Sequence, residues 1–340
     1  MDLRDLVRRS LGDPSAEIAE QRSEDVPAHG SGALSTISLR RLHGTTTAGL
    51  PWSFVVKSIE SPRRRPGMEE LAAHFPWRVD LDTYLAGFAL PDGLRLPRLH
   101  HVEDLGGDRY VMWLEDIRTA DAPWDLDRYR SAARLLGELA AMHPAAGPNE
   151  GLRHYLGGPV EHVFLPALRD PDLWRHPLVA AYADPLLRSD LLALAARIEP
   201  LVAAVAELPH TLSHGDASPG NLLVPADGSA RFVAIDWSWP YATCAGFDLC
   251  QLLVGRAHSG ELTPAELPAV HEAIEAAYVE GSGFSADDVA YGYAATLVLV
   301  AAWTTLPLDR LADEPTPEVH ELFRRRAGLA RFVADLGRGL

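Results

Sequence analysis

Three oxygen-bearing side chains that could hold a cation and accept a proton fall within one stretch of the chain, residues 211–237. The stretch reads TLSHGDASPGNLLVPADGSARFVAIDW, and the side chains are Asp216, Asn221 and Asp236. Carboxylate and amide oxygens suit Mg²⁺, which keeps part of its coordination for water or phosphate. A polar turn explains each residue alone, because Asp and Asn favour turns. The three together at this spacing favour a cation site.

The local pattern predicts a β-hairpin that brings two of these side chains together. NLLVP and ARFVAI are strand-type runs, and PADGS between them contains Asp-Gly, a strong turn signal. A hairpin centred near Gly228 and Ser229 pairs Asn221 with Asp236, at a Cα separation of about 4.5–5.5 Å. Asp216 lies in a loop of small residues that can fold back over this end of the hairpin.

A single lysine is the second chemical signal. Of the 31 basic residues, Lys57 is the only lysine. Because arginine serves at the other basic positions, a lone lysine can mark a place that needs a compact ammonium rather than a planar guanidinium. Chance is the alternative explanation. Lys57 ends the strand-like run WSFVVK.

The elements that must position these residues divide into a strand-rich and a helical part. Alternating apolar residues predict strands, and apolar residues at helical spacing predict helices. The predicted strands are 34–42, 52–60, 108–117 and the hairpin, and the predicted helices are 2–12, 68–75, 77–88, 127–143, 185–208 and most of the chain from 247. We therefore expect an α+β protein with an N-terminal lobe, residues 1–118, and a helical C-terminal lobe, residues 119–340.

Composition narrows the class of protein. The chain has 340 residues and a formal net charge of −16, which disfavours binding to nucleic acid or to an anionic membrane. No uninterrupted apolar run approaches about 20 residues, and the first residues, MDLRDLVRRSLGD, are charged where a signal peptide is apolar. Cys244 and Cys250 are too few for a disulfide scaffold. We expect a cytoplasmic protein.

The residues of the stretch 211–237 resemble the catalytic and metal-binding loops of the aminoglycoside phosphotransferase family, small-molecule kinases related in fold to protein kinases. The resemblance extends over most of the chain and implies a bilobal protein-kinase-like fold, with a small antiparallel-sheet N-terminal lobe and a larger, mainly helical C-terminal lobe. The segments that carry it are Lys57, Trp77-Arg78-Val79-Asp80, the inter-lobe hinge Trp113-Leu114-Glu115-Asp116-Ile117, His214-Gly215-Asp216, Asn221, Ile235-Asp236-Trp237 and Phe247-Asp248-Leu249.

The resemblance also implies a role for each matched residue. Asp216 would be the catalytic residue, which accepts or orients the proton of an acceptor hydroxyl. Asn221 and Asp236 would hold Mg²⁺ on the phosphates of ATP or GTP. The nucleotide-binding residues would be Lys57, its acidic partner Asp80, and the hinge residues Trp113 and Glu115.

The implied activity is transfer of the γ-phosphate to a hydroxyl of a small molecule, such as an aminoglycoside or other antibiotic, an amino sugar or an amino alcohol. Between residues 245 and 290, eight acidic residues stand against one arginine. A cationic acceptor is one interpretation of this excess, and solvated helix faces are the other. Members of the family often have carboxylates near the C-terminus that bind the amines of an aminoglycoside. This chain has arginines there, which argues against an aminoglycoside as the acceptor and so against resistance to such drugs. The sequence does not distinguish the acceptor, ATP from GTP, or the oligomeric state.

Two features depart from the family pattern. The acid expected to pair with Lys57, from the register of the Trp-Arg motif, is Asp80, one methylene shorter than the usual glutamate, with Glu69 and Glu70 as rivals. The predicted phosphate loop between the first strands, HGTTTAGLP at residues 43–51, has only two glycines.

Two alternatives stay open. A zinc-dependent hydrolase would use His214, Asp216, Asp236 and His258, but it would leave Lys57 without a role. A catalytically silent nucleotide-binding pseudokinase would keep the fold without turnover.

Overall fold

The computed structural model describes residues 2–26, 35–65, 76–147, 149–238 and 241–340. The chain divides into two compact units. The first contains residues 1–89, 94–121 and 223–237, and the second contains residues 90–93, 122–222 and 238–340. Residues 223–237 thus belong to the first unit although they follow the predicted division at 118 and 119 along the chain. That predicted division into lobes stays a prediction.

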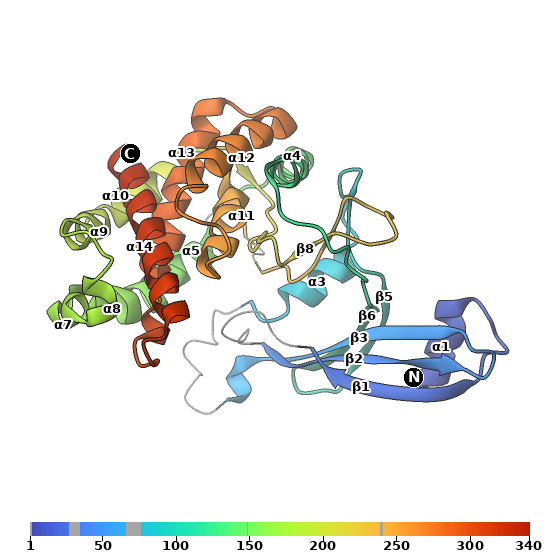
Figure 1. Ribbon diagram of the computed structural model, residues 1–340. Helices are drawn as coiled ribbons and strands as arrows, with labels where there is room; N and C mark the ends of the chain where they lie inside the picture. The colour runs from blue at the N-terminus through green and yellow to red at the C-terminus, as the bar shows by residue number, and fades with distance from the viewer. Residues whose placement is uncertain (1, 27–34, 66–75, 148, 239–240) are drawn as a thin grey trace. The chain divides into compact units, whose positions relative to one another are not determined.

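The first unit is built on a five-stranded antiparallel sheet with the strand order β1-β2-β3-β6-β5 (Figure 1). A second sheet has the order β4-β9-β8, with β4 and β9 parallel. The elements are α1 (Leu3–Leu11), β1 (Ile18–Asp25), β2 (Thr36–Thr46), β3 (Pro51–Glu60), the 3₁₀ turn η1 (Pro62–Arg64), α3 (Val79–Ala86), β4 (Leu94–Arg95), β5 (Leu99–Asp104), β6 (Arg109–Glu115), β8 (Leu222–Leu223) and β9 (Phe232–Ala234).

The five-stranded sheet separates two apolar clusters. Successive side chains of a strand point to opposite faces, so β3 contributes to both clusters. On one face Trp52 and Phe54 pack with Leu6 and Val7 of α1. On the other face Ile59, Met112 and Leu114 pack with Leu81 of α3. Lys57 lies two residues before Ile59 on β3 and opposite Met112 of β6, so it lies on the face that α3 covers.

Strand β1 corrects the sequence analysis. The segment Ile18–Asp25 forms the edge strand of the sheet, although it is not among the predicted strands. Seven of its eight residues are exposed, so it has no apolar alternation to reveal it; pairing of its backbone with β2 holds it in place. Residues 43–46 belong to β2 and residue 51 begins β3, so the turn itself is at residues 47–50 and joins the second strand to the third. The prediction that the segment 43–51 is a loop between the first strands is therefore wrong.

The second unit is mainly helical, with a short two-stranded sheet of β7 and β10. Helices α4 and α12 pack against one another over much of their length. The elements are α4 (Leu126–Met142), α5 (Glu150–Tyr155), η2 (Leu156–Phe164), α6 (Leu165–Arg169), α7 (Pro171–Arg175), α8 (Pro177–Ala180), α9 (Leu187–Ala195), α10 (Ile198–Val205), β7 (His210–Thr211), β10 (Thr243–Cys244), α11 (Phe247–His258), α12 (Leu267–Ser282), α13 (Ala286–Thr296), η3 (Leu297–Ala301), η4 (Ala302–Thr304), η5 (Leu308–Arg310) and α14 (Pro317–Arg338).

These elements confirm the predicted fold class, a small antiparallel sheet with a larger helical part. The predicted helix at 68–75 lies outside the described residues. Among the described residues, one helical segment, Ala286–Arg310, is long and apolar enough to cross a membrane by length and composition alone. Because 72% of its most apolar 18-residue stretch is buried inside the protein, this segment is buried as a core helix is.

Candidate active site

Lys57 forms the centre of a charged cluster in the first unit. Its Nζ donates a hydrogen bond to Oδ2 of Asp80 at 2.7 Å and another to the carboxylate of Asp236. Lys57 is 7% exposed and Asp80 8% exposed. The structure thus brings three predicted site residues together, from β3, from α3 and from the end of β9. The rival acids Glu69 and Glu70 lie outside the described residues.

The electrostatics of this cluster keep the ammonium charged. Burial lowers the pKa of Lys57, but the carboxylates of Asp80 and Asp236 outweigh burial and raise that pKa above its usual value. Burial raises the pKa of Asp80, and the Lys57 ammonium opposes this rise. Asp80 therefore depends on Lys57, since its carboxylate would be buried without compensation if the ammonium were absent, whereas Lys57 also has Asp236 as a partner.

The start of α3 is fixed to the sheet by aromatic contacts. The ring of Trp77 stacks on that of Tyr110 of β6, with centroids 6.0 Å apart, and the Arg78 guanidinium lies 4.8 Å from the centre of the Tyr110 ring. Arg78 also pairs with Asp82 at 2.7 Å, one helical turn further on. These contacts hold the first turn of α3, and with it Asp80, beside β3.

Asp236 has a left-handed backbone, with φ of 56°, which is rare for a residue other than glycine. Trp237, the next residue, is buried and packs edge-to-face on Phe88 with ring centroids 5.1 Å apart. This buried tryptophan anchors the chain directly after Asp236. The Asp236 carboxylate itself stays 49% exposed, so it is accessible to a cation.

The side chains of the two predicted hinge residues lie elsewhere. Trp113 packs edge-to-face on Phe54 in the cluster with α1, on the face of the sheet opposite to Lys57. Glu115 accepts hydrogen bonds from both terminal nitrogens of Arg95, at 2.7 and 3.0 Å. Burial raises the pKa of Glu115, but Arg95 and the backbone N–H of Arg98 outweigh burial and lower it. A role for these two residues in nucleotide binding stays a prediction. Because both side chains are engaged elsewhere, their backbone atoms would make the contacts with the nucleotide.

Sequence reasoning missed a polar cluster beside the hinge. The Asp116 carboxylate accepts hydrogen bonds from Nε of Arg41 at 2.9 Å and from the Ser53 hydroxyl. Arg41 is held from its other side by Glu24 of β1 at 2.9 Å. No local signal marks these residues, because the contacts join positions 17 to 75 residues apart in the chain.

The predicted catalytic loop lies in the second unit, between β7 and β8. The amide nitrogen of Asn221 donates to the backbone oxygen of Asp216 and to its Oδ2, both at 2.9 Å. Because both of these partners are acceptors, the amide must turn its nitrogen toward them. The Asn221 oxygen then faces away from Asp216, where it can act as a ligand.

Asp248, at the start of α11, fastens this loop. Its carboxylate accepts the backbone N–H of His214 at 2.9 Å and that of Gly215 at 2.8 Å. Gly215 has φ of 87°, a left-handed conformation that strains any residue with a side chain, so the His-Gly-Asp sequence has a backbone reason for its glycine. Burial raises the pKa of Asp248 to about 6, against the opposing effect of the two N–H donors.

The two histidines proposed as zinc ligands, His214 and His258, are not arranged as ligands of one zinc ion. The Nδ1 of His214 accepts the backbone N–H of Asp216 at 3.2 Å, within the loop itself. His258 is partly buried beside Arg326, and desolvation lowers its pKa to about 3. Across the described ranges, no three His, Cys, Asp or Glu side chains are grouped so as to hold one metal ion. The geometry therefore gives no support to the zinc hydrolase.

The hairpin strands β8 and β9 are neighbours in the sheet β4-β9-β8, as the sequence predicts. Asn221 belongs to the second unit and Asp236 to the first. Their pairing across a shared cation stays a prediction.

Solved structures with similar folds include an amicoumacin kinase in complex with AMP-PNP, Ca²⁺ and Ami, with a TM-score of 0.50 and 13% sequence identity over 98% of this chain and 94% of that chain. An aminoglycoside phosphotransferase from Alicyclobacillus acidocaldarius also has a TM-score of 0.50, with 15% identity over 93% of this chain and 92% of that chain. No curated protein matches the chain. The structural likenesses show the kinase-like fold of the aminoglycoside phosphotransferases, which confirms the predicted fold.

The sequence profile of the phosphotransferase enzyme family (APH) matches residues 33–284. This range contains Lys57 and Asp80, the loop from His214 to Asn221, Asp236 and Asp248. Since the match covers more than half of the chain and the fold agrees with it, the protein belongs to the phosphotransferase enzyme family.

Proposed function

We propose that this phosphotransferase moves the γ-phosphate of ATP or GTP to a hydroxyl group of a small molecule. The observation that carries the proposal is the only lysine of the chain, buried and paired with Asp80 and Asp236. Taking an ammonium and its carboxylate partners out of water costs desolvation free energy, even when the charges are paired. The protein keeps a charged group in its interior in spite of this cost. A nucleotide phosphate is the ligand that such a fixed point charge suits.

The oxygen donors of the two units suit a magnesium ion. The Asn221 amide has its nitrogen committed to Asp216, which leaves its oxygen for a ligand, and the Asp236 carboxylate is half exposed. Hard oxygen donors of this kind are what Mg²⁺ takes alongside phosphate oxygens. When bound with the nucleotide, the ion would neutralise charge that develops on the phosphates. Asn221 and Asp236 are the residues that would hold it.

Asp216 would position the acceptor hydroxyl and receive its proton. The loop that carries it is held at two points, through Asn221 at one end and through the contacts of Asp248 with His214 and Gly215 at the other. Rigid placement of a proton acceptor is where such an enzyme gains most of its rate, because the protein supplies little covalent chemistry to phosphoryl transfer.

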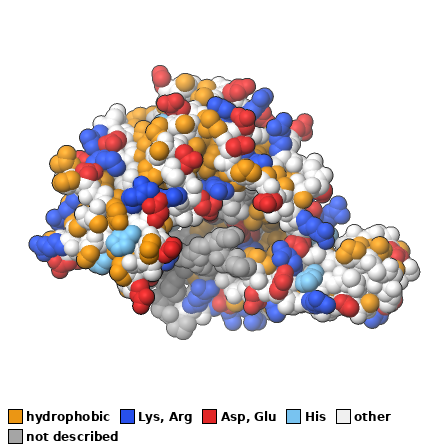
Figure 2. All heavy atoms as spheres, viewed as in Figure 1, with side chains coloured by type: hydrophobic (Ala, Val, Ile, Leu, Met, Phe, Trp, Pro, Cys, Tyr) orange, Lys and Arg blue, Asp and Glu red, His pale blue; other side chains and the backbone are white. Residues whose placement is uncertain are grey.

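We expect the phosphate acceptor to be a small molecule with a hydroxyl group, which can also carry a positive charge. Among the eight acids between residues 245 and 290, Glu261 is paired with Arg256 and Glu280 with Arg134. On the face shown in Figure 2, acidic side chains are interspersed with arginines rather than gathered in one patch. The amicoumacin kinase and the aminoglycoside phosphotransferase of similar fold suggest antibiotics, amino sugars and amino alcohols as the first compounds to test.

We place the reaction in the cytoplasm. Cys244 and Cys250 are both buried free thiols in the structure. Free thiols suit a reducing compartment, which is also where ATP and GTP are abundant.

Phosphate transfer with radiolabelled Mg·ATP or Mg·GTP across these acceptors tests the proposal, with Asp216→Ala beside the wild type. We expect Mg·nucleotide to raise the melting temperature of both proteins, by an amount that corresponds to about 2.7 kcal/mol at 100 times the Kd. Transfer should fall at least ~100-fold in the variant, because a proton acceptor acts in the transition state.

The other outcomes separate the alternatives. Nucleotide binding without transfer to any acceptor would favour the pseudokinase. Loss of stability with a chelator, together with indifference to nucleotide, would favour the zinc hydrolase. Equal transfer by Asp216→Ala and wild type would remove Asp216 from the mechanism.

A further inference from the structure

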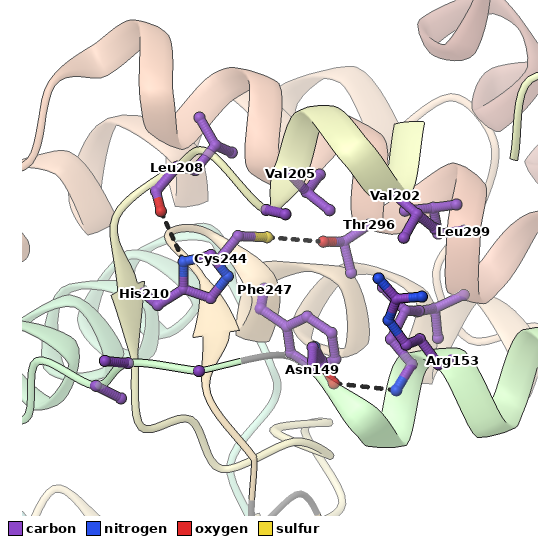
Figure 3. A pocket seen from close by; sticks show the side chains of 16 residues that line it. Asn149, Arg153, Val202, Val205, Leu208, His210, Cys244, Phe247, Thr296 and Leu299 are labelled. Carbon is purple, nitrogen blue, oxygen red and sulfur yellow. Dashed lines mark hydrogen bonds between the residues drawn. The ribbon is translucent and has the colours of Figure 1, made fainter. Parts of the chain in front are cut away.

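A cavity of about 450 Å³ lies within the second unit. It is lined by the chain around α5, by α10 and the residues after it, by the short strands β7 and β10, by the start of α11, by the last residue of α13, and by η3 (Figure 3). This volume is in the range of small-molecule sites in proteins. None of its lining residues belongs to the loop from Leu212 to Asn221, so the cavity is separate from the candidate catalytic loop.

Apolar atoms form slightly more than half of the cavity lining. Val202 and Val205 of α10, Leu299 of η3 and Phe247 of α11 supply aliphatic and aromatic surface. The Thr296 hydroxyl adds little polarity, because it donates to the backbone oxygen of Gly292 at 2.7 Å. An apolar body of aromatic or alkyl type therefore matches this part of the lining.

Charge on the lining is of one sign. Arg153 of α5 is the only charged side chain among the lining residues, and no Asp or Glu is among them. Within the described part of the chain, no carboxylate lies within 4.0 Å of the Arg153 guanidinium, whereas many other arginines of the protein are in ion pairs. Arg153 is an exposed side chain, so it lies at the solvent-accessible edge of the cavity and supplies its only charge, without a carboxylate partner among the described residues.

His210 supplies a polar group on the other side of the cavity from Arg153 (Figure 3). Its Nδ1 lies 2.7 Å from the backbone oxygen of Leu208, so Nδ1 carries the proton and donates it to that oxygen. In the neutral imidazole Nε2 is then an acceptor. The cavity accordingly has a cation at one side, an acceptor at the other and apolar surface between them.

We propose that this cavity is a binding site for a small monoanionic molecule with an apolar body, of the class of aryl or short-chain alkyl carboxylates. Arg153 binds the carboxylate, and α10, η3 and Phe247 enclose the body. The proposal does not depend on phosphotransferase activity, since it rests on the lining of a separate cavity.

Naphthalene-1-acetate and its neutral amide, naphthalene-1-acetamide, are matched probes for this site, because they differ in charge and share one apolar body. Binding to the full-length protein is measured by calorimetric titration of the wild type, Arg153→Gln and Ala206→Phe. Ala206 is an exposed lining residue just after α10, so a phenyl ring there should obstruct the cavity without disturbing the core. The matched controls are Ala203→Phe, exposed on α10 outside the lining, and Arg169→Gln, exposed on α6.

We expect wild type to bind the acid at least ~5-fold more tightly than the amide, and Arg153→Gln to abolish this difference. Ala206→Phe should weaken both probes at least ~10-fold, while the two controls match the wild type. Equal affinity for acid and amide in the wild type would overturn the assignment of an anion. Unchanged binding in Ala206→Phe, with its melting temperature intact, would place the probes elsewhere and overturn the site.

Discussion

Nζ of Lys57 and Oδ2 of Asp80 lie 2.7 Å apart in an interior where each residue is less than a tenth exposed. The contact joins the centre of the sheet to the first turn of α3, across 23 positions of sequence. It fixes a positive charge on the face of the sheet that α3 covers, and it makes Asp80 dependent on Lys57 for its counter-charge.

Removal of Lys57 alone should therefore cost more stability than removal of both partners. We expect Lys57→Met to lower the free energy of unfolding by about 3–5 kcal/mol, because Asp80 is left buried without its counter-charge. The double variant Lys57→Met/Asp80→Asn should regain at least half of that loss. Urea unfolding of the two single variants, the double variant and the wild type measures the coupling. Strictly additive losses would show that the pair contributes nothing as a pair.

Asp248 should give stability a distinctive pH dependence. Its pKa in the folded protein is raised to about 6, mainly by burial, against an ordinary value of 3.8. A raised folded pKa contributes stability that is complete below the unfolded pKa and is lost as pH rises through the folded one. The difference of about two units corresponds to roughly 3 kcal/mol lost between pH 4 and pH 7.

Asp248→Asn lacks this titration and serves as the matched variant. The advantage in unfolding free energy of wild type over Asp248→Asn should therefore shrink as pH rises from 4 to 7, which urea unfolding at four pH values can follow. An advantage that grows with pH would mean that the two N–H donors dominate and that the pKa of Asp248 is lowered.

Gly255 lets α11 approach the catalytic loop. A Cβ at this position would lie 2.7 Å from Cβ of Ser218 and 3.1 Å from Cδ of Pro219, closer than packed atoms come. We expect Gly255→Ala to displace the loop and lower kcat at least ~10-fold, with a loss of stability of about 1–3 kcal/mol. Gly157→Ala is the control, since a Cβ there meets nothing within 4 Å. Normal kcat in Gly255→Ala would show that the loop tolerates the shift.

The sequence predicted the parts of the site that local pattern encodes. Asp216 and Asn221 share one short loop. The Trp-Arg motif favoured Asp80 as the partner of Lys57, with Glu69 and Glu70 left open, and the structure shows the contact with Asp80. Strand β1 escaped prediction because an exposed edge strand carries no apolar alternation. The cluster of Arg41, Ser53 and Asp116 escaped because only tertiary packing brings such distant positions together.

Labelling of the single lysine tests the central claim most directly, namely that Lys57 binds the nucleotide phosphates. Apart from the α-amino group, an amine-selective reagent has one target in this chain. Because Lys57 is buried and its ammonium is held charged, the reagent is an acyl phosphate of ATP, which delivers its reactive carbonyl to the phosphate site, and mass spectrometry separates the two labelled positions. Saturating Mg·ATP should slow the labelling of Lys57 at least ~10-fold, because nucleotide at 10 or more times its Kd leaves less than a tenth of the site open. Labelling of the α-amino group should stay unchanged. Equal rates of Lys57 labelling with and without nucleotide, under conditions where Mg·ATP raises the melting temperature, would place Lys57 outside the site and contradict the account.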